Sequence, residues 1–467
     1  MLTLFTGNHQ RDCSGLSRRD FLQAGTLGLG GLTLPWLLRT RALAAGGDAD
    51  FVRDKAVVLI FLAGGMSHIE SFNPNMDAPE PYHSVTGEVP TELPGVTLGG
   101  TFPLLARHAK KMAIIRSFRH PVGNHEQAIS HVLTGGTDVT GQAQEGFSMG
   151  SLYARLRGAN HPVTGLPTYA LLTAPHKDPQ YAKELPRVVL GSRSGSLGSA
   201  YAPFTPDGGG TALANMQLHL SAQRLDDRRA LLRQLDQLRR GLDARDASQS
   251  YDQFERQAAD LLAGGAARAF DLSREPGKLI ERYDTSMFQC GFKVFEPSAL
   301  GKQMLLARRL IEAGAGFVTV QSAGWDFHAD ANNPGIKPGM EMLGRPLDKA
   351  LSAFLEDLEA RGLLDKVLTI VTGDFGRTPK INPRGGRDHW ANLCTLAFFG
   401  GGLKMGQVIG KSDRTNSAPA SDPISTPNLL STIMHALFDV SILRVTRGMP
   451  SKLVKLIEDH KPITELL

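Results

Sequence analysis

The chain has 467 residues, of which 41% are hydrophobic and 21% are charged, so it is long enough for one large domain or two ordinary ones with a substantial core. Its formal net charge of +5 comes mostly from residues 1–45, which carry five Arg and two Asp. Subtracting these leaves 46 Lys and Arg against 44 Asp and Glu in residues 46–467, a net charge of +2. No basic stripe interleaved with aromatic residues occurs, so nothing in the composition indicates a nucleic-acid partner.

The first 45 residues follow the order of a secretory leader. The pair Arg18-Arg19 precedes an apolar, Gly-rich stretch at 24–38, and small residues suited to cleavage lie at 42–44. The paired arginines resemble the twin-arginine export signal. The alternative is a membrane anchor, but these 15 residues, broken by Gly and Pro35, are too few to span about 30 Å of hydrocarbon.

We therefore expect residues 1–45 to be a twin-arginine signal peptide. The export machinery that reads such signals would be a partner, and the mature protein, residues 46–467, would be periplasmic or secreted without a stable membrane span. The mature chain keeps Cys290 and Cys394, and the sequence leaves their pairing open.

Apolar runs and helical patterns alternate along the mature chain. The sequence predicts strands at 56–63, 112–115, 168–172, 188–190, 317–321, 367–372 and 394–399. It predicts helices at 103–111, 126–133, 148–158, 298–313, 346–361 and 427–438. Such alternation predicts an α/β/α sandwich with a mostly parallel central sheet covered on both faces. Between 224 and 262, Leu recurs at helical spacing amid many charges, which indicates a helical insertion at about 211–290.

Polar side chains gather where the predicted strands end, and in a parallel α/β sheet ligands bind at the carboxyl ends of the strands. An imidazole at the start of helix 126–133 joins them, because unpaired backbone N–H groups lie there. By this criterion the candidate metal ligands are His68, Glu70, His125, Asp326, His328, Asp374 and His389.

A mixed set of imidazoles and carboxylates suits Zn²⁺, Mn²⁺ or Fe better than Mg²⁺ or Ca²⁺, with Zn²⁺ or Mn²⁺ the first choice. The sequence therefore predicts divalent metal ions, one or two, as cofactors. The alternative for each His alone is a structural hydrogen-bonding role. Arg377 and Arg387 suit clamps for an oxyanion, and a salt bridge to Asp374 or Asp388 is the alternative for both.

Two other classes of enzyme are disfavoured. The run Asp374-Phe375-Gly376 matches the magnesium motif of protein kinases, but no Lys-bearing strand or His-Arg-Asp loop lies at the right distance upstream. Ser67 follows Gly64-Gly65 but lacks the Gly-x-Ser-x-Gly elbow of serine hydrolases.

Four motifs carry a resemblance to a known family: GGMSHIESFNPN, GNHEQAISHVLTGG, GWDFH and GDFGRTPKINPRGGRDHW. Together they resemble domain-of-unknown-function family 1501, exported bacterial proteins of the alkaline phosphatase-like and sulfatase-like superfamily. The resemblance covers nearly the whole mature chain and implies the alkaline phosphatase-like fold. It implies that Asp326, His328 and His389 hold one metal and that Asp374 belongs to a second site.

The sequence departs from the superfamily pattern at three places. Phe375 stands where a His would bind the second metal. Gly64-Gly65 replaces the acid expected after the first strand, so that His68 or Glu70 would have to substitute for it. Alignment of Leu133-Thr134-Gly135 with the sulfatase Leu-Thr-Gly motif places His125 at the position of the nucleophile.

The resemblance implies a metal-dependent hydrolase of phosphate or sulfate esters, acting on a small-molecule or glycan ester. Because the covalent nucleophile is replaced, we expect metal-bound hydroxide to attack, with Arg377 or Arg387 holding the developing charge. The alternative is a non-catalytic secreted protein that uses the same pocket to bind a metal or an anionic glycan. A catalytic metal site keeps an open coordination position, whereas a structural site is closed.

Overall fold

The computed structural model describes residues 51–138, 146–206, 267–445 and 451–467. The predicted leader and the Leu-rich part of the predicted insertion lie outside these residues, so both stay predictions. The described end of the insertion region holds the short helices α10 (Ala267–Phe270) and α11 (Gly277–Tyr283). Two compact units are present, and all elements discussed below belong to the unit formed by residues 54–438 and 447–467.

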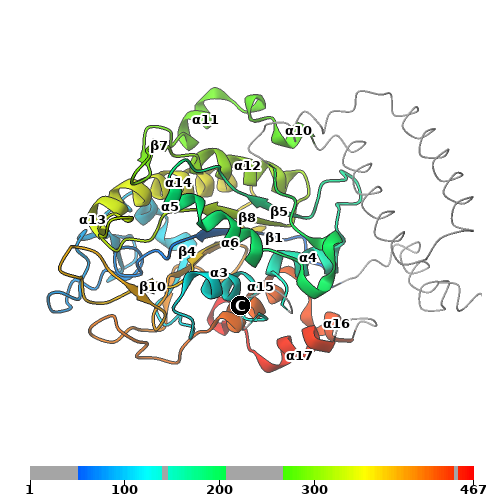
Figure 1. The fold of residues 1–467 in the computed structure, drawn as a ribbon. Coiled ribbons are helices and arrows are strands. Elements are labelled where there is room, and N and C mark those ends of the chain that lie inside the picture. The colour runs from blue at the N-terminus through cyan, green and yellow to red at the C-terminus, as the bar shows by residue number, and fades with distance from the viewer. Residues whose placement is uncertain (1–50, 139–145, 207–266, 446–450) are drawn as a thin grey trace, which may run out of the picture. The chain divides into compact units, whose positions relative to one another are not determined.

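A seven-stranded sheet forms the centre of this unit (Figure 1). Its strand order is β13-β4-β12-β9-β1-β8-β5. The bounds are β1 Ala56–Leu62, β4 Met112–Ile115, β5 Tyr169–Leu172, β8 Phe317–Ser322, β9 Val367–Gly373, β12 Leu396–Gly400 and β13 Gln407–Ile409. Only β12 runs antiparallel to its neighbours, so the predicted mostly parallel sheet is confirmed.

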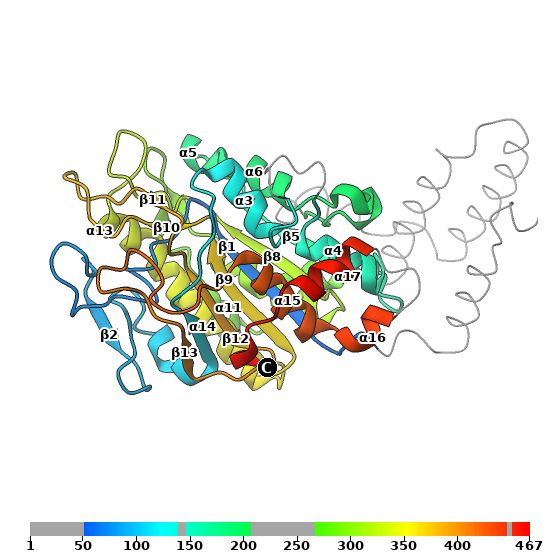
Figure 2. The same cartoon turned by 90° about the horizontal axis from the view of Figure 1, so that it is seen from below.

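Helices cover both faces of the sheet, as Figures 1 and 2 show. On one face lie α12 (Leu300–Glu312) and α14 (Arg345–Ala360). On the other lie α3 (His125–Leu133), α4 (Met149–Arg157), α6 (Glu184–Gly191) and α15 (Thr426–Leu437). The burial of β1 and β8 explains these two layers. All residues of β1, and all residues of β8 except Ser322, are buried, although successive side chains point to opposite faces of the sheet, so both faces must be covered. The predicted α/β/α sandwich is thus confirmed.

Most predicted elements occur within a few residues of their predicted bounds, and two differ. The predicted strand at 188–190 is part of α6. Glu184 and Val188, four residues apart, are buried on one side of α6 while Val189 is 37% exposed, which is helical periodicity in an apolar run too short to show it. The predicted helix at 103–111 is the 3₁₀ helix η1, Leu105–Lys111.

Two further features bear on the expectations from sequence. Cys290 and Cys394 are both buried and free, so they do not pair. None of the helices in the described part of the chain is long and apolar enough to cross a membrane.

Three adjacent strands end together and thereby define one edge of the sheet. Leu62 at the end of β1 pairs with Ser322 of β8 on one side and with Gly373 of β9 on the other. The chain segments that follow these strands therefore enter the same space. Gly64 fits there with φ of +106°, where a Cβ atom would lie 2.7 Å from the backbone nitrogens of Trp325 and Asp326.

This crowding predicts that Gly64→Ala destabilises the fold more than a matched change at Gly362. Gly362 also has positive φ, +67°, but nothing lies within 4 Å of its missing Cβ atom. Gly362→Ala should cost about 1–2 kcal/mol from the left-handed conformation alone, and Gly64→Ala about 1–3 kcal/mol more from the collision. Urea denaturation measures both, and equal losses would contradict the predicted packing.

Candidate metal centre

Four chain segments bring acids and imidazoles to the carboxyl edge of the sheet. Asp326 and His328 follow β8, and Asp374 follows β9 directly. His125 is the first residue of α3, whose N-cap Asn124 accepts a hydrogen bond from the backbone N–H of Gln127. His389 begins β11 (His389–Trp390), which pairs with β10 (Gly376–Arg377) in a two-stranded ribbon. The structure thus brings together five of the seven predicted ligands.

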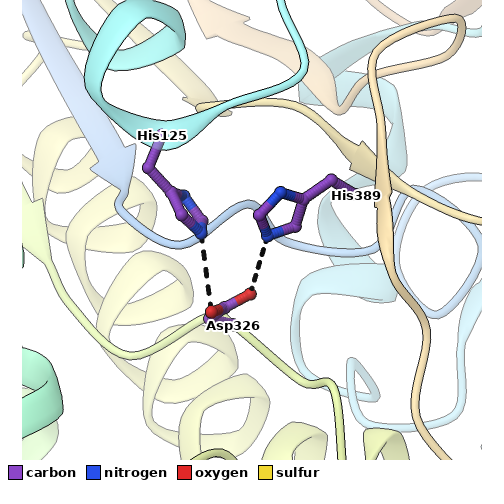
Figure 3. Close-up of side chains that lie close together, drawn as sticks. All are labelled: His125, Asp326 and His389. Atoms are coloured by element: carbon purple, nitrogen blue, oxygen red, sulfur yellow. Dashed lines mark hydrogen bonds and ion pairs between the residues drawn. The ribbon is translucent and has the colours of Figure 1, made fainter.

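The carboxylate of Asp326 is the common neighbour of three imidazoles. Its oxygens lie 3.5 Å from Nε2 of His125, 2.9 Å from Nε2 of His328 and 3.3 Å from Nε2 of His389. Figure 3 shows the rings of His125 and His389, which come from different chain segments, both pointing at Asp326. His125, His389 and Asp326 each offer a donor atom, and these atoms lie within 4.8 Å of one another, as a metal site requires.

Each imidazole is held by an acceptor on its other nitrogen. Nδ1 of His125 lies 2.7 Å from Oδ2 of Asp374, and Nδ1 of His328 lies 2.8 Å from Oδ1 of Asp388. Nδ1 of His389 lies 3.2 Å from the backbone oxygen of Gly123. Carboxylate and carbonyl oxygens accept only, so these partners assign the proton of each neutral imidazole to Nδ1 and leave a lone pair on Nε2.

The donor set therefore fits a divalent cation. Nε2 of His328 and Nε2 of His389 are 2.9 Å apart, and both lone pairs meet the carboxylate of Asp326. Such a convergence of lone pairs is repulsive unless a proton or a metal ion lies among them. Three imidazoles and one carboxylate, each imidazole held by an outer acceptor, are the ligands and supports that Zn²⁺ takes in proteins.

Charges around the cluster decide which groups hold protons when no metal is bound. Burial raises the pKa of Asp326, but the Arg377 charge and the three imidazoles outweigh it and hold that pKa far below its usual range. Burial lowers the pKa of His125, but hydrogen bonds to Asp326 and Asp374 outweigh it and raise the pKa to about 9. For His328 burial is outweighed by Asp326, which raises the pKa, whereas burial prevails at His389 and lowers it.

Arg377 orients Asp326 from within the fold. Its side chain is fully buried, and Nη2 donates to Oδ1 of Asp326 at 2.6 Å. Its other hydrogen bonds go to backbone oxygens, namely those of Gly64, Gly65, Trp325 and Arg387. Its guanidinium group also lies over the ring of Phe375, 5.7 Å from the ring centroid. This placement differs from the predicted contact with an oxyanion, because the donors of Arg377 already have protein acceptors.

Arg387, His68 and Glu70 lie apart from the cluster. The fully buried Arg387 donates to Oε1 of Glu70 at 2.9 Å and to backbone oxygens. Nε2 of His68 lies 3.2 Å from the backbone oxygen of Asn416, and burial lowers the pKa of His68 to about 4. The salt-bridge alternative thus describes both arginines, although their partners are Asp326 and Glu70 rather than Asp374 and Asp388.

Three further residues shape the site without having been predicted as ligands. Asp388 positions His328, and its place directly before His389 in the sequence is the signal that could have indicated it. The ring of Phe375 lies 4.4 Å from that of His389 and fills the place where the resemblance expects a second-metal His. Glu184 is 2% exposed on α6, and burial, followed by the charge of Asp374, raises its pKa well above the ordinary value.

The geometry of the cluster bears on the number of metal ions. Within the described ranges, one group of at least three His, Cys, Asp and Glu side chains has all its donor atoms within 4.8 Å of one another, namely His125, Asp326 and His389. His328 adjoins this group, with Nε2 2.9 Å from Oδ1 of Asp326 and from Nε2 of His389. Because Phe375 stands where the second pair needs an imidazole, the cluster favours one ion rather than two.

The fold and this cluster define an α/β sandwich protein with a candidate metal centre, of the class that the sequence resembles. The chain belongs to the family described as Protein of unknown function (DUF1501), whose model matches residues 54–467. The family resemblance predicted from the motifs is thereby confirmed. A search of curated proteins found no match.

Several solved structures are similar to this chain at low sequence identity. They include the lipoteichoic acid synthase LtaP from Listeria monocytogenes, with 10% identity over 85% of this chain and 74% of that chain and a TM-score of 0.36. The PsFucS1 sulfatase from Pseudoalteromonas sp. has 12% identity over 81% of this chain and 68% of that chain, with a TM-score of 0.34. The alkaline phosphatase of the Antarctic bacterium TAB5 has 12% identity over 78% of this chain and 95% of that chain, with a TM-score of 0.33. Likenesses this distant carry no argument about chemistry, which must come from the cluster itself.

Removal of a cluster ligand should remove the metal. We expect about one Zn²⁺ or Mn²⁺ per chain in the wild-type protein. Asp326→Ala and His389→Ala should hold far less, because each variant lacks one of the proposed metal ligands. His435→Ala is the matched control, since His435 is not part of the cluster and its Nδ1 lies 2.8 Å from the backbone oxygen of Ser431 on the same helix, α15. Elemental analysis of the purified proteins decides, and equal metal content in all of them would contradict the site.

Metal binding should displace the proton of His125 and so depend on pH. Because the folded pKa of His125 is raised from 6.5 to about 9, its stabilising charge is fully present below pH 6.5 and lost as pH rises through about 9 in the metal-free protein. The stabilisation gained by adding metal should therefore grow between pH 6.5 and 9. Melting temperatures with and without metal at several pH values test this, and a gain that stays constant or shrinks would refute it.

Proposed function

We propose that the protein is a metal-dependent hydrolase of phosphate or sulfate esters. The observation that carries this proposal is the convergence of three Nε2 atoms on the carboxylate of Asp326, with each Nδ1 held by a separate acceptor. A divalent cation held by His125, His328, His389 and Asp326 would polarise an ester oxygen and make water a better nucleophile at neutral pH. The proposed site of action is outside the cytoplasm, an inference that rests on the leader-like residues 1–45.

The residues around the cluster keep its geometry and charge fixed. Arg377 holds Asp326 ionised and in place, while Asp374 and Asp388 fix the ring orientation of His125 and His328. Burial raises the pKa of Glu184 well above its usual value, which favours the neutral form of this carboxyl group beside Asp374. The ring of Phe375 packs against His389 and keeps water away from that face of the imidazole.

No side chain of the described cluster is free to act as a covalent nucleophile. Both nitrogens of His125 are engaged, Nδ1 by Asp374 and Nε2 by Asp326. Ser67, the hydroxyl next to the end of β1, is fully buried and donates to the carboxylate of Glu70. These contacts support direct attack by water on the ester.

The access that a substrate needs lies on the side of His328 and His389. Their side chains are 17% and 27% exposed, against 6% for Asp326. An ester could therefore reach the cluster over these two rings, while Asp326 stays covered.

A non-catalytic metal-binding protein is the second candidate, and one observation favours it. Three imidazoles and one carboxylate suffice to complete a tetrahedral shell, and a closed shell is typical of structural zinc. The binding of an anionic glycan has less support, because Arg377 and Arg387 are both fully buried and bonded to protein acceptors.

If water attacks directly, hydrolysis inverts the configuration at a chiral phosphate ester, whereas a covalent enzyme intermediate gives retention. We expect inversion with metal-loaded protein on a panel of aryl phosphate and sulfate esters. Retention, or an adduct trapped on Ser67 or another side chain, would overturn the mechanism. No turnover by metal-replete protein on the whole panel would favour the binding protein.

A substitution next to the cluster tests the role of Asp388 in the same ester hydrolysis. Asp388→Ala should lower activity about 10–100-fold, because it removes the acceptor that holds the ring of His328. Because the Asp388 side chain is 55% exposed, the melting temperature of the Asp388→Ala protein should stay close to that of the wild type. An unchanged melting temperature separates an effect on the site from unfolding.

A further inference from the structure

A large cavity lies beside the metal centre, and the residue that follows His328 in the chain lines it. Its volume is about 690 Å³, within the range of small-molecule sites, and its wall includes Ala329. Ala329 follows His328, so their Cα atoms are about 3.8 Å apart. A further part of the wall comes from the hairpin of β6 (Gln289–Cys290) and β7 (Glu296–Pro297), and α13 (Ile336–Gly339) contributes Pro338. Figure 1 shows β7 and α13 on the left of the view.

The lining of this cavity is mainly apolar. Phe292 and Phe295 come from the hairpin, and Pro334, Pro338 and Met342 come from the segment after His328. Phe295 is 63% exposed, so its ring is accessible to a ligand that enters the cavity.

The acidic residues in the lining already have partners. The Asp330 carboxylate accepts from the backbone N–H groups of Asn332 at 2.8 Å and Asn333 at 2.9 Å. Glu341 pairs with Arg345 one helical turn later. No Lys or Arg is among the described residues that line the cavity, so it offers nothing to the repeated negative charges of a sulfated glycan.

The cavity is preformed, because contacts to the rest of the fold hold its hairpin wall at two places, the turn and β6. The fully buried Asp178 accepts from the backbone N–H groups of Phe292, Lys293 and Val294 at 2.6–3.1 Å. Sγ of Cys290 contacts the backbone oxygen of Met342 at 3.6 Å. Met342 itself lies in the π-helical turn Met340–Gly344 (η5), a feature that is frequent at functional sites.

We propose that this cavity binds an uncharged aromatic ring, the organic group of the ester whose anionic end reaches the metal centre. The assignment of the ring to an ester rests on the proposed function, whereas binding of the ring itself does not. The apolar walls, the preformed shape, the absence of Lys and Arg from the described lining and the position next to His328 all favour an aryl ester over a polyanionic glycan.

Binding of a neutral probe tests the cavity without any turnover. Calorimetric titration with 2-naphthol should show binding to the wild-type protein, with or without metal. We expect Phe295→Ala and Phe292→Ala to weaken it about tenfold, because each removes an aromatic partner. Met287→Ala is the matched control, since Met287 is also 63% exposed but lies outside the lining, and it should bind as the wild type does.

Turnover then separates this inference from the proposed function. If the protein hydrolyses esters, kcat/KM for 2-naphthyl phosphate should exceed that for phenyl phosphate, and Phe295→Ala should remove the difference. Naphthol binding that depends on Phe295 without turnover of any ester would retain the cavity assignment and refute the hydrolase. No naphthol binding, binding unaffected by both Phe variants, or preference for a sulfated oligosaccharide would overturn the cavity assignment.

Discussion

The ionised carboxylate of Asp326 is the interaction on which the rest of the site depends. Arg377 holds it from inside the fold, and His125, His328 and His389 approach it from the exposed side. The sheet makes this possible, because β8, β1 and β9 are adjacent, parallel and end in register. Gly64 between them allows the turn after β1 to pass against Asp326 without a side chain and donates its N–H to Asp374.

Charge balance explains why this arrangement calls for a cation. Asp326 and Asp374 are both buried, and Arg377 is the fixed positive charge in contact with Asp326. Burying carboxylates without further compensation is costly, so His125 takes up a proton when no metal is present, as its pKa of about 9 indicates. A divalent ion bound to the Nε2 atoms would supply positive charge at the same place. The proton and the metal are thus alternative occupants of one electrostatic position.

The sequence predicted the sheet and much of the site for the same reason, since β1, β8 and β9 are mainly apolar runs that polar residues follow within a few positions. Asp326, His328, Asp374 and His389 could be placed at strand ends, and His125 at a helix start. It did not separate His68, Glu70 and Arg387 from the cluster, and it did not show that Arg377 contacts Asp326 rather than an oxyanion. The direction of these side chains depends on long-range contacts, such as those of His68 with Asn416 and of Arg387 with Glu70, which no local pattern encodes. Glu184 had no signal at all, since α6 reaches the site only through tertiary packing.

The central claim is that three Nε2 atoms and one carboxylate surround a single cation. X-ray absorption spectroscopy at the zinc edge measures this most directly in the zinc-loaded protein. The account predicts a first shell containing three imidazole nitrogens at about 2.0–2.1 Å with one or more oxygens, and loss of one imidazole in His328→Ala. A shell of oxygens with fewer than two imidazoles, or a shell unchanged in His328→Ala, would contradict it.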